Sequence, residues 1–140
     1  MPITTRDLWR ISNCRSLSGE GGLKYAARWH SAGRRILYLA ESAAGAMLEV
    51  LVHLELGTDE LPRSYTLLRV QAPIELEVVS ISLPAGGTWR GDHLLSRRLG
   101  DEWLASGVSA LARVPSAILS DTFNYLLNPL HPDAKGITMA

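Results

Sequence analysis

Short runs of alternating apolar and polar residues in the N-terminal part of the chain predict β-strands separated by loops. Residues 8–11 alternate weakly and predict a first strand, and residues 16–22, rich in serine and glycine, predict a loop. Residues 25–30 are compatible with a short strand. A turn at residues 31–33 then precedes residues 35–40, which predict a further strand.

The second half of the chain predicts more strands. Residues 63–70 and 74–81 are rich in apolar and β-branched residues and are joined around Pro73. Residues 110–119 predict a late strand. Its Pro115 indicates a sheet edge or a bulge, because proline has no N–H to donate to a neighbouring strand. Residues 124–132 contain two prolines and predict a loop.

Two segments have helical patterns. Residues 43–52 form an apolar run that is typical of a buried helix, with Ser42 as a suitable N-cap and an end near Gly57. Residues 92–106 carry apolar side chains spaced by four, and Gly107 is a suitable stop. The charges of this second helix are spaced to form two ion pairs on a solvated face, Arg97–Asp101 and Arg98–Glu102.

The order of these elements favours an α+β fold. Strands and helices do not alternate regularly, as they would in a doubly wound α/β sheet. The chain has no internal repeat, low-complexity tract or linker, so residues 1–140 are predicted to form one compact domain. A chain of this length buries roughly 70% of its extended surface on folding, which is enough for a core.

Composition narrows the classes of function. Apolar residues make up 46% of the chain, which argues against disorder, and the zero net charge disfavours a protein that coats nucleic acid. The single cysteine, Cys14, cannot form an internal disulfide and fits a reducing cytoplasm. Because no hydrophobic signal region and no apolar run of ~20 residues is present, a cytoplasmic protein without a membrane span is expected.

Glu49 interrupts the apolar run of residues 43–52 and is the strongest candidate for a functional residue. A carboxylate in an apolar helix costs free energy unless it is paired or used. One helical turn before it lie Gly45 and Ala46, whose small size leaves room for a ligand to approach the carboxylate. The alternative is a glutamate on the one exposed stripe of a buried helix.

Arg28, Tyr38 and His53 are further candidates, and each has an ordinary structural alternative. The Arg28 guanidinium can bind phosphate or carboxylate in bidentate geometry, or it can lie over Trp29 at the surface. Tyr38 can stack on a planar ligand or pack in the core. His53, one turn after Glu49, can hydrogen-bond that carboxylate or a ligand, although a satisfied core histidine is the commoner case.

Several kinds of site are disfavoured by residue spacing. Ser116 lacks the G-x-S-x-G elbow of a serine nucleophile, so it is a candidate for hydrogen bonding only. Residues 19–22 match neither a P-loop nor G-x-G-x-x-G. The four histidines and Cys14 show no zinc-ligand spacing, so no metal site is predicted. Two Arg-Arg pairs are too few to indicate nucleic-acid binding.

Six short segments share their order and spacing with a known family: residues 19–22 (Gly-Glu-Gly-Gly), 27–29 (Ala-Arg-Trp), 38–42, 48–53, 113–116 (Arg-Val-Pro-Ser) and 124–132. No single segment is decisive, but the set is specific and resembles the RES domain family over nearly the whole chain. The family is named for an arginine, a glutamate and a serine, which fall on Arg28, Glu49 and Ser116. The family commonly has asparagine at the position of His30.

The resemblance implies a fold similar to the ADP-ribosyltransferases, with a central, mainly antiparallel sheet and flanking helices. It also implies the toxin of a type II toxin–antitoxin pair that uses NAD⁺ as its substrate and requires no cofactor. The expected partner is an Xre-type helix-turn-helix antitoxin that occludes the active site, with a homodimer as one arrangement within that complex. Direct contact with nucleic acid or a membrane is not expected.

The resemblance also implies the roles of individual residues. Cleavage of the nicotinamide–ribose bond develops positive charge on the ribose, which a fixed carboxylate stabilises, and Glu49 is expected to do so through a ribose hydroxyl. Arg28 is expected to bind the pyrophosphate or the adjoining ribose, and Tyr38 to stack near the nicotinamide. Ser116 is expected to orient Glu49 or to bind the nicotinamide side. NAD⁺ binding is expected to extend to two more residues, His53 and Asn124.

The acceptor of the ADP-ribose stays open in the sequence. Water or phosphate as acceptor would deplete cellular NAD⁺ and arrest growth, and this is the favoured interpretation. A protein side chain as acceptor would make the chain a mono-ADP-ribosyltransferase that modifies a host protein. An RNA-cleaving toxin is less favoured because no basic groove or acid–base pair stands out, and in a non-catalytic binding module Glu49 would be structural.

Overall fold

A computed structural model describes residues 4–12, 15–56, 66–119 and 121–139, without the side chains of residues 52–56. The described residues form one seven-stranded sheet in the order β4-β5-β6-β2-β1-β3-β7. Its strands are β1 (Thr5–Ser12), β2 (Leu37–Ala40), β3 (Thr66–Pro73), β4 (Val78–Ser80), β5 (Leu111–Pro115), β6 (Phe123–Leu127) and β7 (Thr138–Met139). Among the described strands, only β4 and β5 pair in parallel, so the predicted α+β class with a mainly antiparallel sheet is confirmed.

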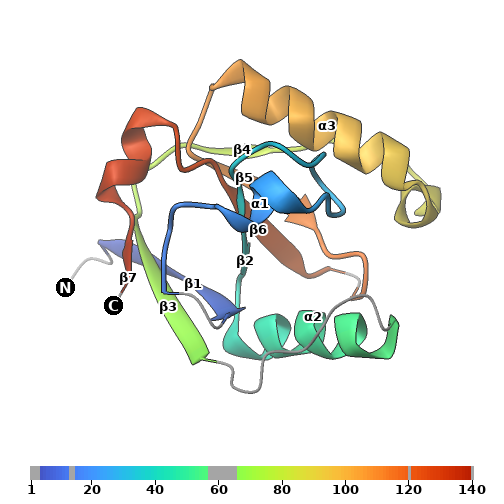
Figure 1. The fold of residues 1–140 in the computed structure, drawn as a ribbon, viewed down its shortest axis with the longest axis horizontal. Helices are drawn as coiled ribbons and strands as arrows, with labels where there is room; N and C mark the ends of the chain where they lie inside the picture. Colours follow the sequence, from blue (N-terminus) through green and yellow to red (C-terminus); the bar gives the residue numbers. More distant parts are fainter. Residues whose placement is uncertain (1–3, 13–14, 57–65, 120, 140) are drawn as a thin grey trace.

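Three α-helices and two 3₁₀ helices surround the described part of the sheet: α1 (Gly21–Lys24), α2 (Ala43–Leu56), α3 (His93–Ser106), η1 (Thr88–Gly91) and η2 (Pro132–Gly136). Figure 1 shows α2 and α3 at opposite ends of the molecule, with the sheet between them and the short α1 in front. Helix α2 packs against β1 and β2, and α3 contacts η1. The two long helices therefore frame the segment that leads from α1 into β2.

The core lies on both faces of the sheet, because successive strand residues point to opposite sides. One cluster contains Leu37 and Leu39 of β2 with Tyr125 of β6. The other contains Leu126 of β6, with Tyr38 packed against it. This second cluster is rich in tryptophan and joins the sheet to α3 and η1 through the side chains of Trp29, Trp89 and Trp103. Tyr38 and Arg28 are thus placed at the tryptophan-rich face.

Side-chain caps mark the start of both predicted helices. The Ser42 hydroxyl accepts a hydrogen bond from the Gly45 N–H at 2.9 Å at the start of α2. Asp92 accepts from the Leu95 N–H at 3.0 Å at the start of α3. Gly107, with φ of 62°, ends α3 in the left-handed conformation that glycine adopts without strain.

Three strand predictions are corrected. Residues 25–30 form no strand and contain a tight turn at residues 27–30, in which the Ala27 N–H donates to the His30 carbonyl oxygen at 3.0 Å. Residues 123–127 form β6, a central strand, since the two prolines of the predicted loop begin only at Pro129. Pro115 is the last residue of β5, which lies inside the sheet between β4 and β6 and not at its edge.

One of the two ion pairs predicted on the surface of α3 is present. Arg98 and Glu102 form the expected exposed pair, with 3.9 Å between Nε and Oε1. The Arg97–Asp101 pair is wrong, because Arg97 instead donates from Nε to the Ala27 carbonyl oxygen at 2.7 Å. Helix α2 is not buried on all sides: about half of the Met47 side chain is exposed.

Candidate functional site

Glu49 lies half-buried on the side of α2 that faces the sheet. Its Oε1 accepts a hydrogen bond from Nδ2 of Asn124 on β6 at 2.8 Å. Asn124 lies opposite Ala40, the last residue of β2, and α2 begins three residues later at Ala43. The amide therefore ties the helix to the sheet and fixes the direction of the carboxylate. Among the described side chains, no hydrogen bond reaches the second oxygen of the Glu49 carboxylate.

Arg28 lies in the segment between α1 and β2, and its guanidinium is held by η1 and α3. Nη1 donates to the Arg90 carbonyl oxygen at 2.9 Å, and Nη2 lies 3.5 Å from Nε2 of His93. A guanidinium has five donors, so these contacts leave others for a phosphate or carboxylate. The sequence gives no sign of Arg90 or His93 as neighbours of Arg28, since they lie about sixty residues away.

The charges of Arg28 and Glu49 act on each other. Partial burial lowers the pKa of Arg28, while the nearby carboxylate of Glu49 raises it. Within the described residues the two side chains form no direct ion pair, so both charges remain available to a third partner. A cation and a carboxylate that face one region without neutralising each other suit a ligand that carries both an anionic group and a developing positive charge.

Tyr38 uses its hydroxyl for internal hydrogen bonds. The oxygen accepts from the Trp29 N–H at 3.1 Å and lies 2.7 Å from Nδ1 of His30. The His30 Nε2 lies 3.3 Å from the Gly22 carbonyl oxygen, which can only accept, so Nε2 carries the proton and Tyr38 donates to Nδ1. Burial raises the pKa of Tyr38, which keeps the hydroxyl protonated. Only the ring of Tyr38 is therefore free to contact a ligand.

Ser116 shapes the loop after β5. Its side chain is buried, and its hydroxyl oxygen accepts from the N–H groups of Ile118 at 3.1 Å and Leu119 at 3.2 Å. The hydrogen bond that orients Glu49 comes from Asn124 and not from Ser116. Contact of Ser116 with nicotinamide stays a prediction. The predicted role of His53 falls on a side chain outside the described residues.

Two hollows of the described surface lie away from these residues. An open depression of about 400 Å³ is lined by residues of α3 and the segment before β2, among them Ser31, Arg34 and Asp101. A second, of about 280 Å³, is lined by residues that include Leu23, Arg35 and Leu130. Neither contains Arg28, Tyr38, Glu49 or Ser116. Opposed charges and fixed geometry, and not hollow size, identify the candidate site.

His30 gives a testable pH dependence of stability. The side chain is only 2% exposed, and burial lowers its pKa below the ordinary value of 6.5 because the charged form is poorly solvated. His30 therefore binds a proton more readily in the unfolded chain than in the folded protein. The free energy of unfolding should be highest above pH 6.5 and should fall as the pH drops below that value. Urea denaturation at about pH 7.5 and pH 5 should show this loss. A His30→Gln variant should lose less, and an equal loss in both proteins would contradict the assignment.

Metal ligands do not cluster in the described part of the chain. Among those residues, no three histidine, cysteine, aspartate or glutamate side chains gather as a metal site would require. The helices described for this chain include none that is both long and apolar enough to cross a membrane.

The chain is similar to known proteins over most of its length. The sequence model named RES domain matches residues 7–139. A Pseudomonas putida protein named Toxin Res is 45% identical over 128 residues, which cover 91% of this chain and 88% of that protein. A Sphingobium sp. protein named Prs ADP-ribosylating toxin is 38% identical over 144 residues, which cover 95% of this chain and 88% of that protein.

A solved structure has the same fold. It is the toxin–antitoxin complex MbcT–MbcA of M. tuberculosis, matched with a TM-score of 0.73 and 17% sequence identity over 97% of this chain and 81% of that chain. This likeness concerns the fold alone. The family match and the identities to the Toxin Res and Prs proteins cover almost every residue from β1 to β7, and they show that the chain belongs to the RES domain family.

Proposed function

We propose that this chain is the toxin of a toxin–antitoxin pair and that it cleaves the nicotinamide–ribose bond of NAD⁺, which depletes the NAD⁺ of the cytoplasm. The observation that carries the proposal is the Glu49 carboxylate, fixed by Asn124 at 2.8 Å and left without a direct cationic partner among the described residues. Relatives named as toxins, one of them as an ADP-ribosylating toxin, support it.

The chemistry requires one stabilising carboxylate and no strong acid. The bond between the ribose carbon and the nicotinamide nitrogen breaks, and its electron pair moves to the pyridinium ring, which leaves as neutral nicotinamide. The ribose becomes oxocarbenium-like and is attacked by an acceptor that then loses its proton to solvent. A carboxylate held beside the ribose stabilises the positive charge as it develops. Glu49 is the group that this chain offers for the task.

Other residues bind the ends of the substrate in this proposal. Arg28 binds the pyrophosphate or the adjoining ribose through those N–H groups of its guanidinium that do not contact Arg90 or His93. The Tyr38 ring contacts the nicotinamide, since its hydroxyl is engaged by Trp29 and His30. His53, Ser116 and Asn124 remain candidates for further contacts with NAD⁺.

A second candidate function differs only in the acceptor. With water or phosphate the products are nicotinamide and ADP-ribose or its phosphate, and with a protein side chain the same site is a mono-ADP-ribosyltransferase. The name of the relative Prs ADP-ribosylating toxin fits this second candidate, although not better than the first. We favour cleavage of free NAD⁺ and keep transfer to a protein side chain as the second candidate.

The proposed partner is an antitoxin of the Xre helix-turn-helix type that covers the active site. The structural relative was solved as a toxin–antitoxin complex, which supports an antitoxin as the partner, whatever its type. A homodimer within that complex stays a prediction. Co-expression with the neighbouring gene product should restore growth of cells that produce the chain.

The direct test follows nicotinamide. Purified protein is incubated with NAD⁺, and the products are separated in buffer with and without phosphate and with host-cell protein. Release of nicotinamide in buffer alone supports hydrolysis, release that requires phosphate supports phosphorolysis, and label transferred to protein supports the second candidate. Absence of release under all three conditions would overturn the proposal, and RNA cleavage by the same sample would favour the RNA-cleaving alternative.

Asn124 should act on the rate through Glu49. Replacing Asn124 by alanine removes the donor that holds the carboxylate, and we expect a loss of about tenfold in kcat with little change in KM, because the interaction matters most as charge develops. Asn128→Ala is a matched control, since Asn128 is also an asparagine with little exposure and its side chain accepts from the nearby Leu130 N–H. An equal fall of kcat in both variants would show that the effect is not specific to Glu49.

A further inference from the structure

One peptide group in the chain is held at both of its polar atoms by side chains from two different elements. It is the peptide that joins Arg28 to Trp29. Its carbonyl oxygen accepts from the hydroxyl of Ser96 on α3 at 2.6 Å, and its N–H donates to the hydroxyl of Tyr38 on β2 at 3.1 Å. The Ser96 side chain is fully buried, with 0% exposed. A helix and a strand thus meet on the residue that carries the candidate cation.

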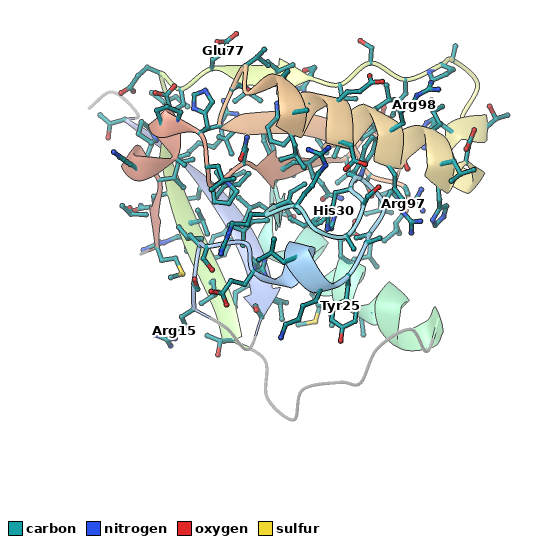
Figure 2. All side chains as sticks on the ribbon, turned by 45° about the horizontal axis from the view of Figure 1, so that its top comes forward. Arg15, Tyr25, His30, Glu77, Arg97 and Arg98 are labelled. Carbon is teal, nitrogen blue, oxygen red and sulfur yellow. The ribbon has the colours of Figure 1, made fainter. Side chains whose placement is uncertain are left out.

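His30 fixes the direction of the Tyr38 hydroxyl. His30 accepts its proton on Nδ1 at 2.7 Å and donates from Nε2 to the Gly22 carbonyl oxygen. Figure 2 shows His30 in the middle of the molecule, away from its rim. Since the proton of Tyr38 is committed to His30, its lone pairs face the Trp29 N–H, and the tyrosine can serve this peptide only as an acceptor.

The helix holds the neighbouring backbone on the same side. Arg97, one residue after Ser96, donates to the Ala27 carbonyl oxygen at 2.7 Å, and Asp101 accepts from the Ser31 N–H at 2.9 Å. The peptide before Arg28 and the backbone after His30 are therefore tied to α3 as well. What distinguishes the Arg28–Trp29 peptide is that the sheet also reaches it, through Tyr38.

We propose that Tyr38 and Ser96 are positioning residues for Arg28, which set the direction of its guanidinium by clamping the peptide that follows it. This role rests on the proposed cleavage of NAD⁺. It assigns the hydroxyls of Tyr38 and Ser96 to the positioning of Arg28 in that reaction. The plane of this peptide fixes the direction in which the Arg28 side chain leaves the backbone. The contact of Nη1 with the Arg90 carbonyl then fixes its far end. A small rotation of the peptide would move the guanidinium away from an anionic substrate group.

The test compares two variants with two matched controls. Tyr38→Phe keeps the ring and removes one hydroxyl, and Ser96→Ala removes the other. Tyr125→Phe and Ser109→Ala remove hydroxyls from two other buried residues. The Tyr125 hydroxyl bonds to Arg6, and the Ser109 hydroxyl bonds to Trp103 and Leu111. We expect KM for NAD⁺ to rise roughly fivefold to tenfold in each of the first two variants, with kcat within about threefold, while the controls keep both constants.

A second readout does not depend on catalysis. The N–H of Trp29 should exchange with solvent deuterium at least about fivefold faster in Tyr38→Phe than in the wild-type protein, and Tyr125→Phe should leave it unchanged. If Ser96→Ala does not fold, Tyr38→Phe decides the question alone. Unchanged Trp29 exchange, or an unchanged KM in a folded Tyr38→Phe protein that still cleaves NAD⁺, would overturn the positioning role. A wild-type protein that releases no nicotinamide would instead overturn the proposed function.

Discussion

Replacing Glu49 by glutamine is expected to lower the rate of nicotinamide release by about 10²–10³-fold while leaving the protein folded. The lost rate is the lost stabilisation of positive charge on the ribose, because glutamine has the shape of glutamate without its charge. The Oε1 of the new amide can still accept from Asn124 Nδ2, so the link between α2 and β6 is kept. We expect the free energy of unfolding to change by about 1 kcal/mol or less. Single-turnover release of nicotinamide and a urea denaturation curve measure the two effects.

The matched control is Glu102→Gln, the same chemical change at an exposed position of α3, where the carboxylate pairs with Arg98. It should keep the wild-type rate, since exposed pairs contribute little and Glu102 lies on a different helix from Glu49. A Glu49→Gln variant that still releases nicotinamide at the wild-type rate would refute the catalytic role. A fall in melting temperature of more than about 10 °C would show that Glu49 serves mainly as a structural link.

The candidate carboxylate could be found from the sequence because it breaks a pattern. Glu49 is a charge within an apolar helix, and Asn124 is a polar residue within the apolar strand Phe123–Leu127. In the structure these two exceptions meet, which explains both: each satisfies the other where an isolated polar group would cost free energy. What the sequence could not show was the pairing, because the two residues lie 75 positions apart.

The surroundings of Arg28 could not be predicted for a related reason. Ser96 and Arg97 stand on a helix whose charged residues suggested pairs within the helix, and local spacing favours that interpretation. The structure shows that Arg97 and Asp101 bind backbone atoms of the segment before β2 instead, and that Ser96 binds the Arg28 carbonyl. Backbone donors and acceptors in a loop leave no trace in the pattern of side chains, so only the fold reveals them.

Replacing Gly100 by alanine is expected to cause a large loss of stability, because the glycine allows α3 to lie directly on the segment that carries Arg28. A Cβ at this position would overlap the carbonyl oxygen of Trp29 and come within 2.7 Å of its carbonyl carbon. Alanine is the better helix former by up to about 1 kcal/mol, but this gain is outweighed, because the atoms in its way belong to backbone fixed by Ser96 and Tyr38. Gly100→Ala should therefore lower the free energy of unfolding by about 3 kcal/mol and the melting temperature by about 10 °C.

Gly21→Ala separates this effect from a general intolerance of alanine for glycine. Gly21 opens α1, and a methyl group added there would meet no atom within 4 Å, so its substitution should leave the melting temperature within a few degrees of wild type. If Gly100→Ala folds, the backbone of Trp29 must shift, and KM for NAD⁺ should rise in parallel with the loss of stability. A Gly100→Ala protein as stable as Gly21→Ala would show that α3 does not approach Trp29 so closely. In that case the clamp on Arg28 would need another support, since Ser96 reaches the Arg28 carbonyl only through this close approach.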